Sequence, residues 1–347
     1  MIISVHLFRW DLTPYPREYI CGEFDFGIDE VNRELTSEFT LTEDIKIEKG
    51  DWLRAKYIPS GKYAYFGIAD SQDNKTIRCR GLMGLGDSYF PTYRTSGNSF
   101  ESHAKSIITN YLLNDRTKNL NGTLSIDVES DTAHSYQAIE LNSRRINSYL
   151  INGFRKYNVK WYVKAISGGR IQTGIKRIEK SIQIMDNSSE FSDWDYWVKK
   201  PGVGNENALL IVDKATNSMD HPIILATYYL ENDNNVTNNP NSNKIIRPTV
   251  NTVYIYDQDL EDKPTYLEVA NSELKGNAYS HEINCKVMFQ AKNIDVEEIE
   301  TGLLANVRIK NTIYQSVLTA WRVNSTENKM QLTFGNIRSR LSEYFDE

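Results

Sequence analysis

The residues with the clearest chemical potential lie together in one short segment, Ser192-Asp-Trp-Asp-Tyr-Trp-Val198. Two carboxylates and three aromatic rings are groups that a glycoside hydrolase uses, because an acid pair cleaves the bond and aromatic rings stack on sugars. Asp193 and Asp195 are two residues apart, however, so in a strand both side chains point to one side and Trp194 to the other. An isolated acid pair also lacks the surroundings that make one group an acid and the other a base. We therefore interpret the segment as a strand with solvated acids, Trp194 in a core and the other two rings packed nearby.

The other residue types that perform chemistry are dispersed along the chain. The five histidines form no His-x-x-x-His or His-x-His pair, so the sequence predicts no metal site. They are His6, His103, His134, His221 and His281. The segment Gly81-Leu-Met-Gly-Leu-Gly86 lacks the Gly-x-Gly-x-x-Gly order and a strand-to-helix setting, so we interpret it as a loop. We expect no catalytic, cofactor-binding or metal-binding residue, no cofactor, and no enzymatic activity.

Composition limits the classes of protein to be considered. With 347 residues, 40% hydrophobic and 25% charged, the chain matches a folded soluble protein of two or more domains. The net charge of -6 does not indicate a positively charged surface for nucleic acid. No apolar run is long enough for a membrane helix. The N-terminus resembles a first strand and not a signal peptide. Cys21, Cys79 and Cys285 are far apart, which argues against a disulfide framework or a zinc cluster and fits folding in a reducing cytoplasm.

The elements that must position these residues are mostly strands. Between Ile28 and Leu85, short alternating stretches follow one another every 8–12 residues or so with turn signals between them, which predicts a small antiparallel barrel or sandwich. Apolar residues at helical spacing predict helices over 99–113, 143–157 and 265–274, with Ser99 or Asn98 capping the first and Asn142 the second.

The expected fold is mainly β with an α+β insert: two small antiparallel β-barrel-like domains plus an α/β module, in a ring-forming hub architecture. The domains are predicted as an N-terminal β-barrel at 1–98, an α/β insert at 99–200, a β segment at 201–256 that returns to the first barrel, and a second β-barrel with a short C-terminal helix at 257–347.

A faint internal repeat is the most informative pattern. Lys49-Gly-Asp51 opens a strand that leads to strands near 63–68 and 76–79. Thr301-Gly-Leu303 likewise opens a strand that leads to strands near 312–319 and 329–334, with gaps that agree to within about two residues. Two interpretations remain open: two copies of one barrel unit, or two unrelated β-meanders with similar sequence patterns. If the repeat is real, three subunits could close a ring with quasi-sixfold geometry.

Together with further motifs, these residues make the chain similar to the tail hub family of long-tailed phages. That family includes myophage baseplate hub proteins and the N-terminal structural part of siphophage tail-associated lysins. The resemblance spans essentially the whole chain. The resemblance rests on five short motifs and on an amphipathic C-terminal segment with Ile337, Leu341, Tyr344 and Phe345. The motifs are Lys49-Gly-Asp51, Phe66-Gly-Ile68, Glu101-Ser-His-Ala104, Asn251-Thr-Val-Tyr-Ile255 and Leu332-Thr-Phe-Gly-Asn-Ile-Arg338.

The resemblance implies a non-enzymatic structural protein of the virion tail tip, assembled in the host cytoplasm. It implies a homotrimeric ring that closes the tail tube below a distal-tail protein ring and opens for the transient passage of DNA. Further expected partners are the tape-measure protein and receptor-binding proteins, and no membrane segment is expected. Because the sequence ends at Glu347, after the last predicted barrel, we expect any wall-degrading activity to reside elsewhere.

Two other functions remain as alternatives. The 21 tyrosines and six tryptophans would suit a carbohydrate-binding module for host recognition, although β-rich cores and subunit interfaces use the same residues. A cell-wall glycosidase that uses Asp193 and Asp195 is the third candidate. We also expect exposed aromatic patches on the barrels to meet across subunits.

Overall fold

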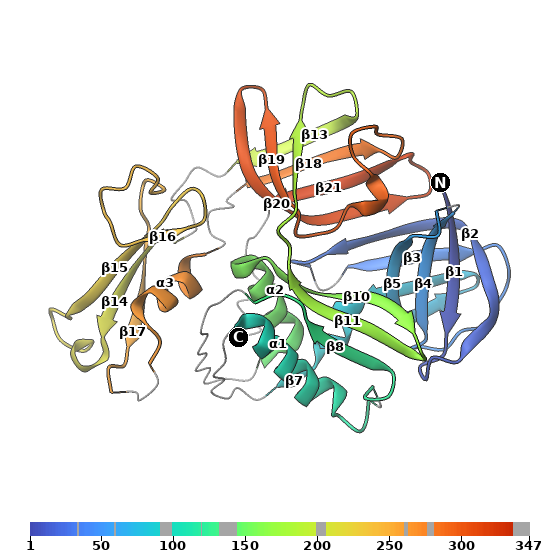
Figure 1. Ribbon diagram of the computed structural model, residues 1–347, viewed down its shortest axis with the longest axis horizontal. Coiled ribbons are helices and arrows are strands. Elements are labelled where there is room, and N and C mark those ends of the chain that lie inside the picture. The colour runs from blue at the N-terminus through green and yellow to red at the C-terminus, as the bar shows by residue number, and fades with distance from the viewer. Residues whose placement is uncertain are drawn as a thin grey trace.

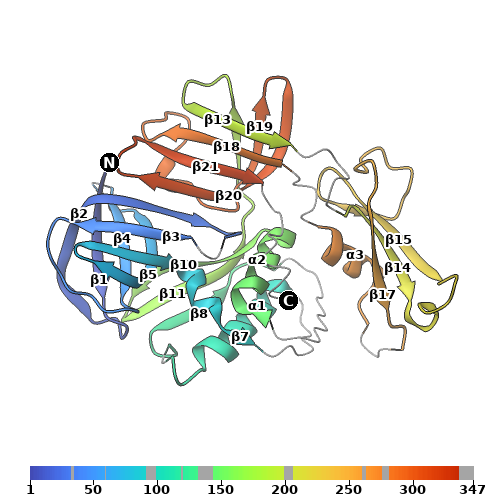
Figure 2. The same cartoon turned by 180° about the vertical axis from the view of Figure 1, so that it is seen from behind.

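The structure is a computed structural model that describes residues 1–32, 35–58, 60–90, 99–118, 120–131, 144–198, 206–259, 263–275 and 281–335. Strands dominate these residues and helices are few, which confirms the predicted mainly β fold with an α+β insert. Figures 1 and 2 show two strand-built bodies, an insert with helices beside them, and a smaller lobe at one end of the long axis. No helix among the described residues is long and apolar enough to cross a membrane.

The N-terminal body is a closed barrel of six antiparallel strands. Their order is β1-β4-β5-β6-β3-β2, and β2 pairs back onto β1. Alternate residues point inward, so Phe26, Phe39 and Tyr65 pack against one another in the barrel core. The strands are β1 Ile2–Phe8, β2 Pro14–Asp29, β3 Thr36–Leu41, β4 Trp52–Ile58, β5 Tyr63–Asp73 and β6 Thr76–Gly81.

The insert that follows β6 packs two helices against a three-stranded sheet, β10-β11-β8. The hydroxyl of Ser99 caps α1 as predicted, accepting a hydrogen bond from the Ser102 amide, whereas Asn142 lies outside the described residues. Trp52 of the first barrel shares a core with Phe100 and Trp161 of the insert. The insert comprises η1 Leu82–Asp87, β7 Tyr89–Phe90, α1 Phe100–Ile108, η2 Thr109–Leu113, β8 Leu124–Val128, β9 Arg144–Arg145, α2 Ile146–Tyr157, β10 Val159–Ser167 and β11 Arg170–Arg177.

The second body is a barrel-like sheet of six strands, called the second barrel below. Its order is β12-β19-β20-β21-β18-β13, and β20 also pairs with β2, which joins both bodies into one continuous sheet. Strands β12 and β13 come from residues that the sequence assigned to the insert at 99–200. That assignment is wrong for them, because they pair with β19 and β18. The strands are β12 Ser181–Met185, β13 Phe191–Val198, β18 His281–Met288, β19 Leu304–Ile309, β20 Thr312–Asn324 and β21 Lys329–Gly335.

A four-stranded sheet, β16-β15-β14-β17, with one covering helix forms the smaller lobe. The prediction that 201–256 returns to the first barrel is therefore wrong, because among the described strands β14 pairs with β15 and β17 and with none of the first barrel. Helix α3 confirms the predicted helix at 265–274, and Thr265 and Glu268 form its capping box. The elements are β14 Ala208–Asp213, η3 Lys214–Thr216, β15 Ile224–Leu230, β16 Val236–Thr237, β17 Asn251–Tyr256 and α3 Tyr266–Leu274. The short helix η4 Val296–Glu298 belongs to the second barrel, and the predicted C-terminal helix lies outside the described residues.

The two bodies repeat one plan. If β12, β13 and β18–β21 are counted as strands one to six, both bodies have the strand order 1-4-5-6-3-2. Gly50 and Gly302 precede the fourth strand, both at positive φ, of 97° and 91°. The Gly50 amide bonds the Ala69 carbonyl and the Ala69 amide bonds the Asp51 carbonyl. Gly302, Leu318 and Leu303 make the same pair of bonds.

A further shared detail supports the repeat. In each body, the fifth strand has a bulge against the sixth just after that pair of bonds, at Ala69–Ser71 and at Leu318–Ala320. The bodies differ at strand one, since β1 runs antiparallel to β4 whereas β12 runs parallel to β19. The shared bonds favour two copies of one barrel unit over two unrelated meanders.

Candidate functional site: the joined sheet and its junction with the insert

The acidic aromatic segment at 192–198 forms β13, an outer strand of the second barrel. A bulge between Ser192 and Asp195 places Asp193 at a φ of 53°, so strict alternation is interrupted. Asp193 lies 3.3 Å from Lys329 Nζ and 3.8 Å from Lys286 Nζ, and the hydrogen bond from Lys329 lowers the pKa of its carboxyl. A carboxylate held ionised in this way is poorly suited to donate a proton as a general acid.

The aromatic residues of β13 divide between core and surface. Trp194 packs against the barrel core beside Phe191, as predicted. Tyr196 and Trp197 are 41% and 45% exposed, so these two rings lie at the surface and not in the core.

The dispersed histidines and the glycine-rich segment have structural surroundings. His281 is buried and its Nε2 lies 2.8 Å from Ser316 Oγ, and His6 Nδ1 lies 2.9 Å from Arg54. His134 lies outside the described residues, among which no cluster of three His, Cys, Asp or Glu side chains could hold a metal ion. Residues 82–87 form the short helix η1, and Gly86 packs against Asn147 of α2. The three cysteines are buried free thiols.

A polar row crosses the outer face of the joined sheet. Direct cross-strand neighbours link Arg78 to Glu38, Glu38 to Asp25, Arg322 to Gln331, and Gln331 to Lys286. The row thus spans β6, β3, β2, β20, β21 and β18, and it bridges both bodies.

Each charge in this row has an opposite charge beside it. Arg78 Nε lies 2.9 Å from Glu38 Oε1, and Arg322 makes two bonds to Asp25, of 2.5 and 2.9 Å. Lys286 Nζ lies 2.8 Å from Glu327. The row is therefore polar, but its charges largely cancel.

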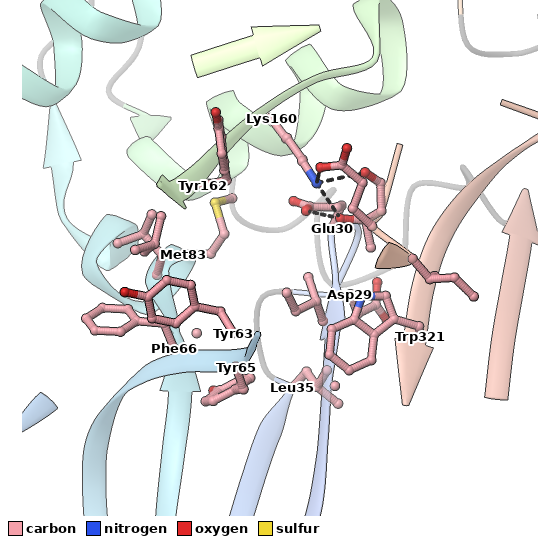
Figure 3. Close-up of a pocket in the computed structure, with 18 of the residues that line it drawn as sticks. Asp29, Glu30, Leu35, Tyr63, Tyr65, Phe66, Met83, Lys160, Tyr162 and Trp321 are labelled. Atoms are coloured by element: carbon pink, nitrogen blue, oxygen red, sulfur yellow. Dashed lines mark hydrogen bonds and ion pairs between the residues drawn. The ribbon is translucent and has the colours of Figure 1, made fainter. Parts of the chain in front are cut away.

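A cavity of about 450 Å³ lies where both barrels meet the insert. Figure 3 shows Tyr63, Phe66 and Met83 on one side, with Glu30 and Trp321 opposite them. None of the described residues that line it is a serine, cysteine or histidine, so the described lining holds no nucleophile paired with a histidine base.

One wall of this cavity is a buried cluster of charges from three parts of the chain. Lys160 of β10 donates to the Thr301 carbonyl at 2.9 Å and lies 3.1 Å from Glu300. The Thr301 hydroxyl donates in turn to Glu30, at the end of β2, at 2.6 Å. Lys176 also contacts Glu300, at 3.2 Å. The cluster therefore holds the insert to both barrels.

In this cluster, burial and ion pairing shift the pKa of each charged group in opposite directions. Burial raises the pKa of Glu30, although Lys160 and the Thr301 hydroxyl counteract it. Burial lowers the pKa of Lys160, against the attraction of Glu30 and Glu300. Burial acts to raise the pKa of Glu300, but Lys160 and Lys176 outweigh it and lower that pKa. The sequence did not single out these residues; the only local signal is that Lys160 stands between the apolar residues Val159 and Trp161.

Solved structures of phage proteins share this architecture. No protein-family model matches the chain, and no curated protein sequence matches it. The 43 kDa tail protein of prophage MuSo2 from Shewanella oneidensis superposes with a TM-score of 0.57 at 10% identity, over 96% of this chain and 97% of that one. The chain has the fold of a phage tail protein.

Two more tail proteins agree with that result. A tail protein from Neisseria meningitidis MC58 has a TM-score of 0.55 at 11% identity, over 96% of both chains. Prophage tail protein gp18 from Listeria monocytogenes EGD-e has a TM-score of 0.55 at 13% identity, over 100% of this chain and 98% of that one. At these identities the tail-protein fold is what the comparison establishes, and it confirms the resemblance at that level.

Proposed function

We propose that this protein is a non-enzymatic structural subunit of a phage or prophage tail tip, and that three copies form a ring around a channel for DNA. The observation that carries the proposal is the doubled barrel, two bodies of equal strand order joined by β2 and β20. Homo-oligomers close by symmetry, and three such chains place six similar barrels around one axis. The tail-protein fold supports the same assignment.

The polar row suits the lining of such a channel. DNA binds tightly to surfaces with unpaired positive charge, because each contact releases counterions. On the joined sheet, Arg78, Arg322 and Lys286 are each paired with an acid. A hydrated face with cancelled charges would let DNA pass without holding it.

The parts outside the barrels have mechanical roles in this proposal. The insert and the lobe contact neighbouring tail proteins: a distal-tail ring, the tape-measure protein and receptor-binding proteins. The Lys160 cluster keeps the insert fixed to both barrels while the ring opens. Assembly takes place in the host cytoplasm, and the finished ring resides at the virion tail tip.

Electron microscopy of tagged particles tests this proposal. An epitope is inserted directly after Pro240, in an exposed loop of the lobe, where it should leave the barrels intact. Gold-labelled antibody should mark one end of the tail in induced particles, and untagged particles serve as the control. Tagged protein found only in the soluble fraction, with unlabelled particles, would contradict the proposal.

The exposed rings of Tyr196 and Trp197 favour one second candidate, a carbohydrate-binding module for host recognition. A glycan array with the purified protein decides between the two functions. Binding that disappears in Trp197→Ala but persists in Tyr89→Ala would support the module. Digestion of cell walls by the wild type but not by Asp193→Asn would support the glycosidase instead.

A further inference from the structure

The two Asn-Gly pairs of the chain lie in opposite kinds of structure. They are Asn121-Gly122 and Asn152-Gly153. An asparagine before a glycine is prone to lose its side-chain amide, because glycine has no Cβ to hinder attack by its own amide nitrogen. The reaction requires the peptide group between the two residues to turn toward the asparagine side chain. The fold therefore decides which of the two asparagines can react.

The peptide group between Asn121 and Gly122 is the centre of a β-turn. The Leu120 carbonyl accepts a hydrogen bond from the Thr123 amide at 3.0 Å, which leaves Asn121 and Gly122 as the two central residues. Both of them are exposed. Among the described residues, neither the Asn121 carbonyl nor the Gly122 amide has a hydrogen-bond partner. Nothing lies within 4 Å of a Cβ at Gly122, so the space around this peptide group is open.

Both ends of this turn are fixed to the insert. The Leu120 carbonyl also accepts hydrogen bonds from the Leu124 amide at 2.9 Å and from the Thr123 hydroxyl at 3.2 Å. Leu120 is fully buried and Leu124 is 2% exposed, in the core that α1 and α2 share with the three-stranded sheet. A reaction at the exposed tip leaves these two buried side chains in place, so it does not require the insert to unfold.

The peptide group between Asn152 and Gly153 is held in place. It lies in the middle of α2, where its carbonyl and its amide are both bonded within the helix. Gly153 is buried, and a Cβ there would lie 2.0 Å from the ring of Phe100 in α1. Figures 1 and 2 show these two helices side by side. Rotation of this peptide group would break helical hydrogen bonds and push against that ring.

We propose that Asn121 is a site of spontaneous deamidation in the folded protein and that the fold protects Asn152. Base removes the proton from the Gly122 amide, and that nitrogen attacks Cγ of Asn121. A C–N bond forms, the bond from Cγ to Nδ2 breaks, and ammonia leaves. Water then opens the resulting succinimide at either carbonyl, which gives aspartate or isoaspartate and adds one negative charge to the insert. The site needs only the folded insert, so it does not depend on the proposed ring.

Peptide mapping of the full chain by mass spectrometry tests the proposal. The folded protein is kept in warm, mildly alkaline buffer and sampled over time, and an isoaspartyl methyltransferase labels the isoaspartate product. We expect progressive conversion of Asn121 while Asn152 stays intact. In concentrated urea, where the helix and its packing are lost, both asparagines should react at similar rates.

Gly122→Ala is the matched variant, because a Cβ has room there and the φ of Gly122 is not positive. The added methyl group hinders attack by the amide nitrogen, so conversion of Asn121 in the folded protein should slow severalfold. Conversion at the wild-type rate in this variant would overturn the proposal. So would an intact Asn121, or equal conversion of both asparagines, in the folded wild type. Protection of Asn152 that persists in urea would overturn it too, because the fold would then not be the cause.

Discussion

At the scale of single residues, Lys160 is the cation on which the junction depends. It is buried and contacts Glu300 and Thr301, next to Glu30. Lys160→Met removes the ammonium group but keeps a long apolar side chain. Glu30 and Glu300 then lack the buried cation beside them. We expect the free energy of unfolding in urea to fall by about 3 kcal/mol. Lys164→Met, on the same strand and partly exposed, should cost much less, because a solvated ion pair contributes little. Equal losses in the two variants would contradict the role given to Lys160.

His281 gives the fold a pH dependence at the same scale. Burial lowers the pKa of His281 from an ordinary value near 6.5 to about 4. Between these pH values the unfolded chain binds a proton at this histidine that the folded chain does not bind. The contribution of neutral His281 to stability is therefore fully present above pH 6.5 and is lost as the pH falls toward 4. From pH 7 to pH 5.5 the loss should be about 1 kcal/mol in urea titrations. His281→Gln should flatten this part of the profile, and an unchanged slope would contradict the assignment.

At the scale of elements, the glycine before the fourth strand defines each barrel unit. Gly50 and Gly302 have φ values of 97° and 91°, where a side chain is strained. Alanine at either position should destabilise the protein by about 1–2 kcal/mol. Gly302→Ala should cost more, because its Cβ would lie 2.7 Å from Ile178, whereas at Gly50 the nearest atom is 3.6 Å away. Gly122→Ala, where nothing lies within 4 Å, is the control, and a loss there of similar size would contradict the argument.

Local patterns predicted elements well and their partners poorly. The strand that follows Lys49-Gly-Asp51 and the strand near 63–68 were predicted because alternation and turn residues are local signals. They correspond to β4 and to the first half of β5. Strand β14 was assigned to the wrong sheet, because an apolar strand has the same pattern whichever sheet it joins, and its parallel partner β17 is about forty residues away. Lys160, Glu30 and Glu300 escaped detection for the same reason, since only tertiary folding brings them together.

At the scale of the whole molecule, the repeat is what connects sequence, fold and function. The faint similarity around Gly50 and Gly302 corresponds to equivalent hydrogen bonds and bulges in two bodies joined edge to edge. Strand pairing between β2 and β20 makes the two bodies one continuous sheet. The proposed ring would place both bodies of each of its three copies around one axis.

The most direct test of this account is the solution mass of the purified full chain, measured by light scattering across a concentration series. We expect a trimer, or a monomer that becomes trimeric when a distal-tail ring is added. A chain that remains monomeric at every concentration, and with every such partner, would contradict it.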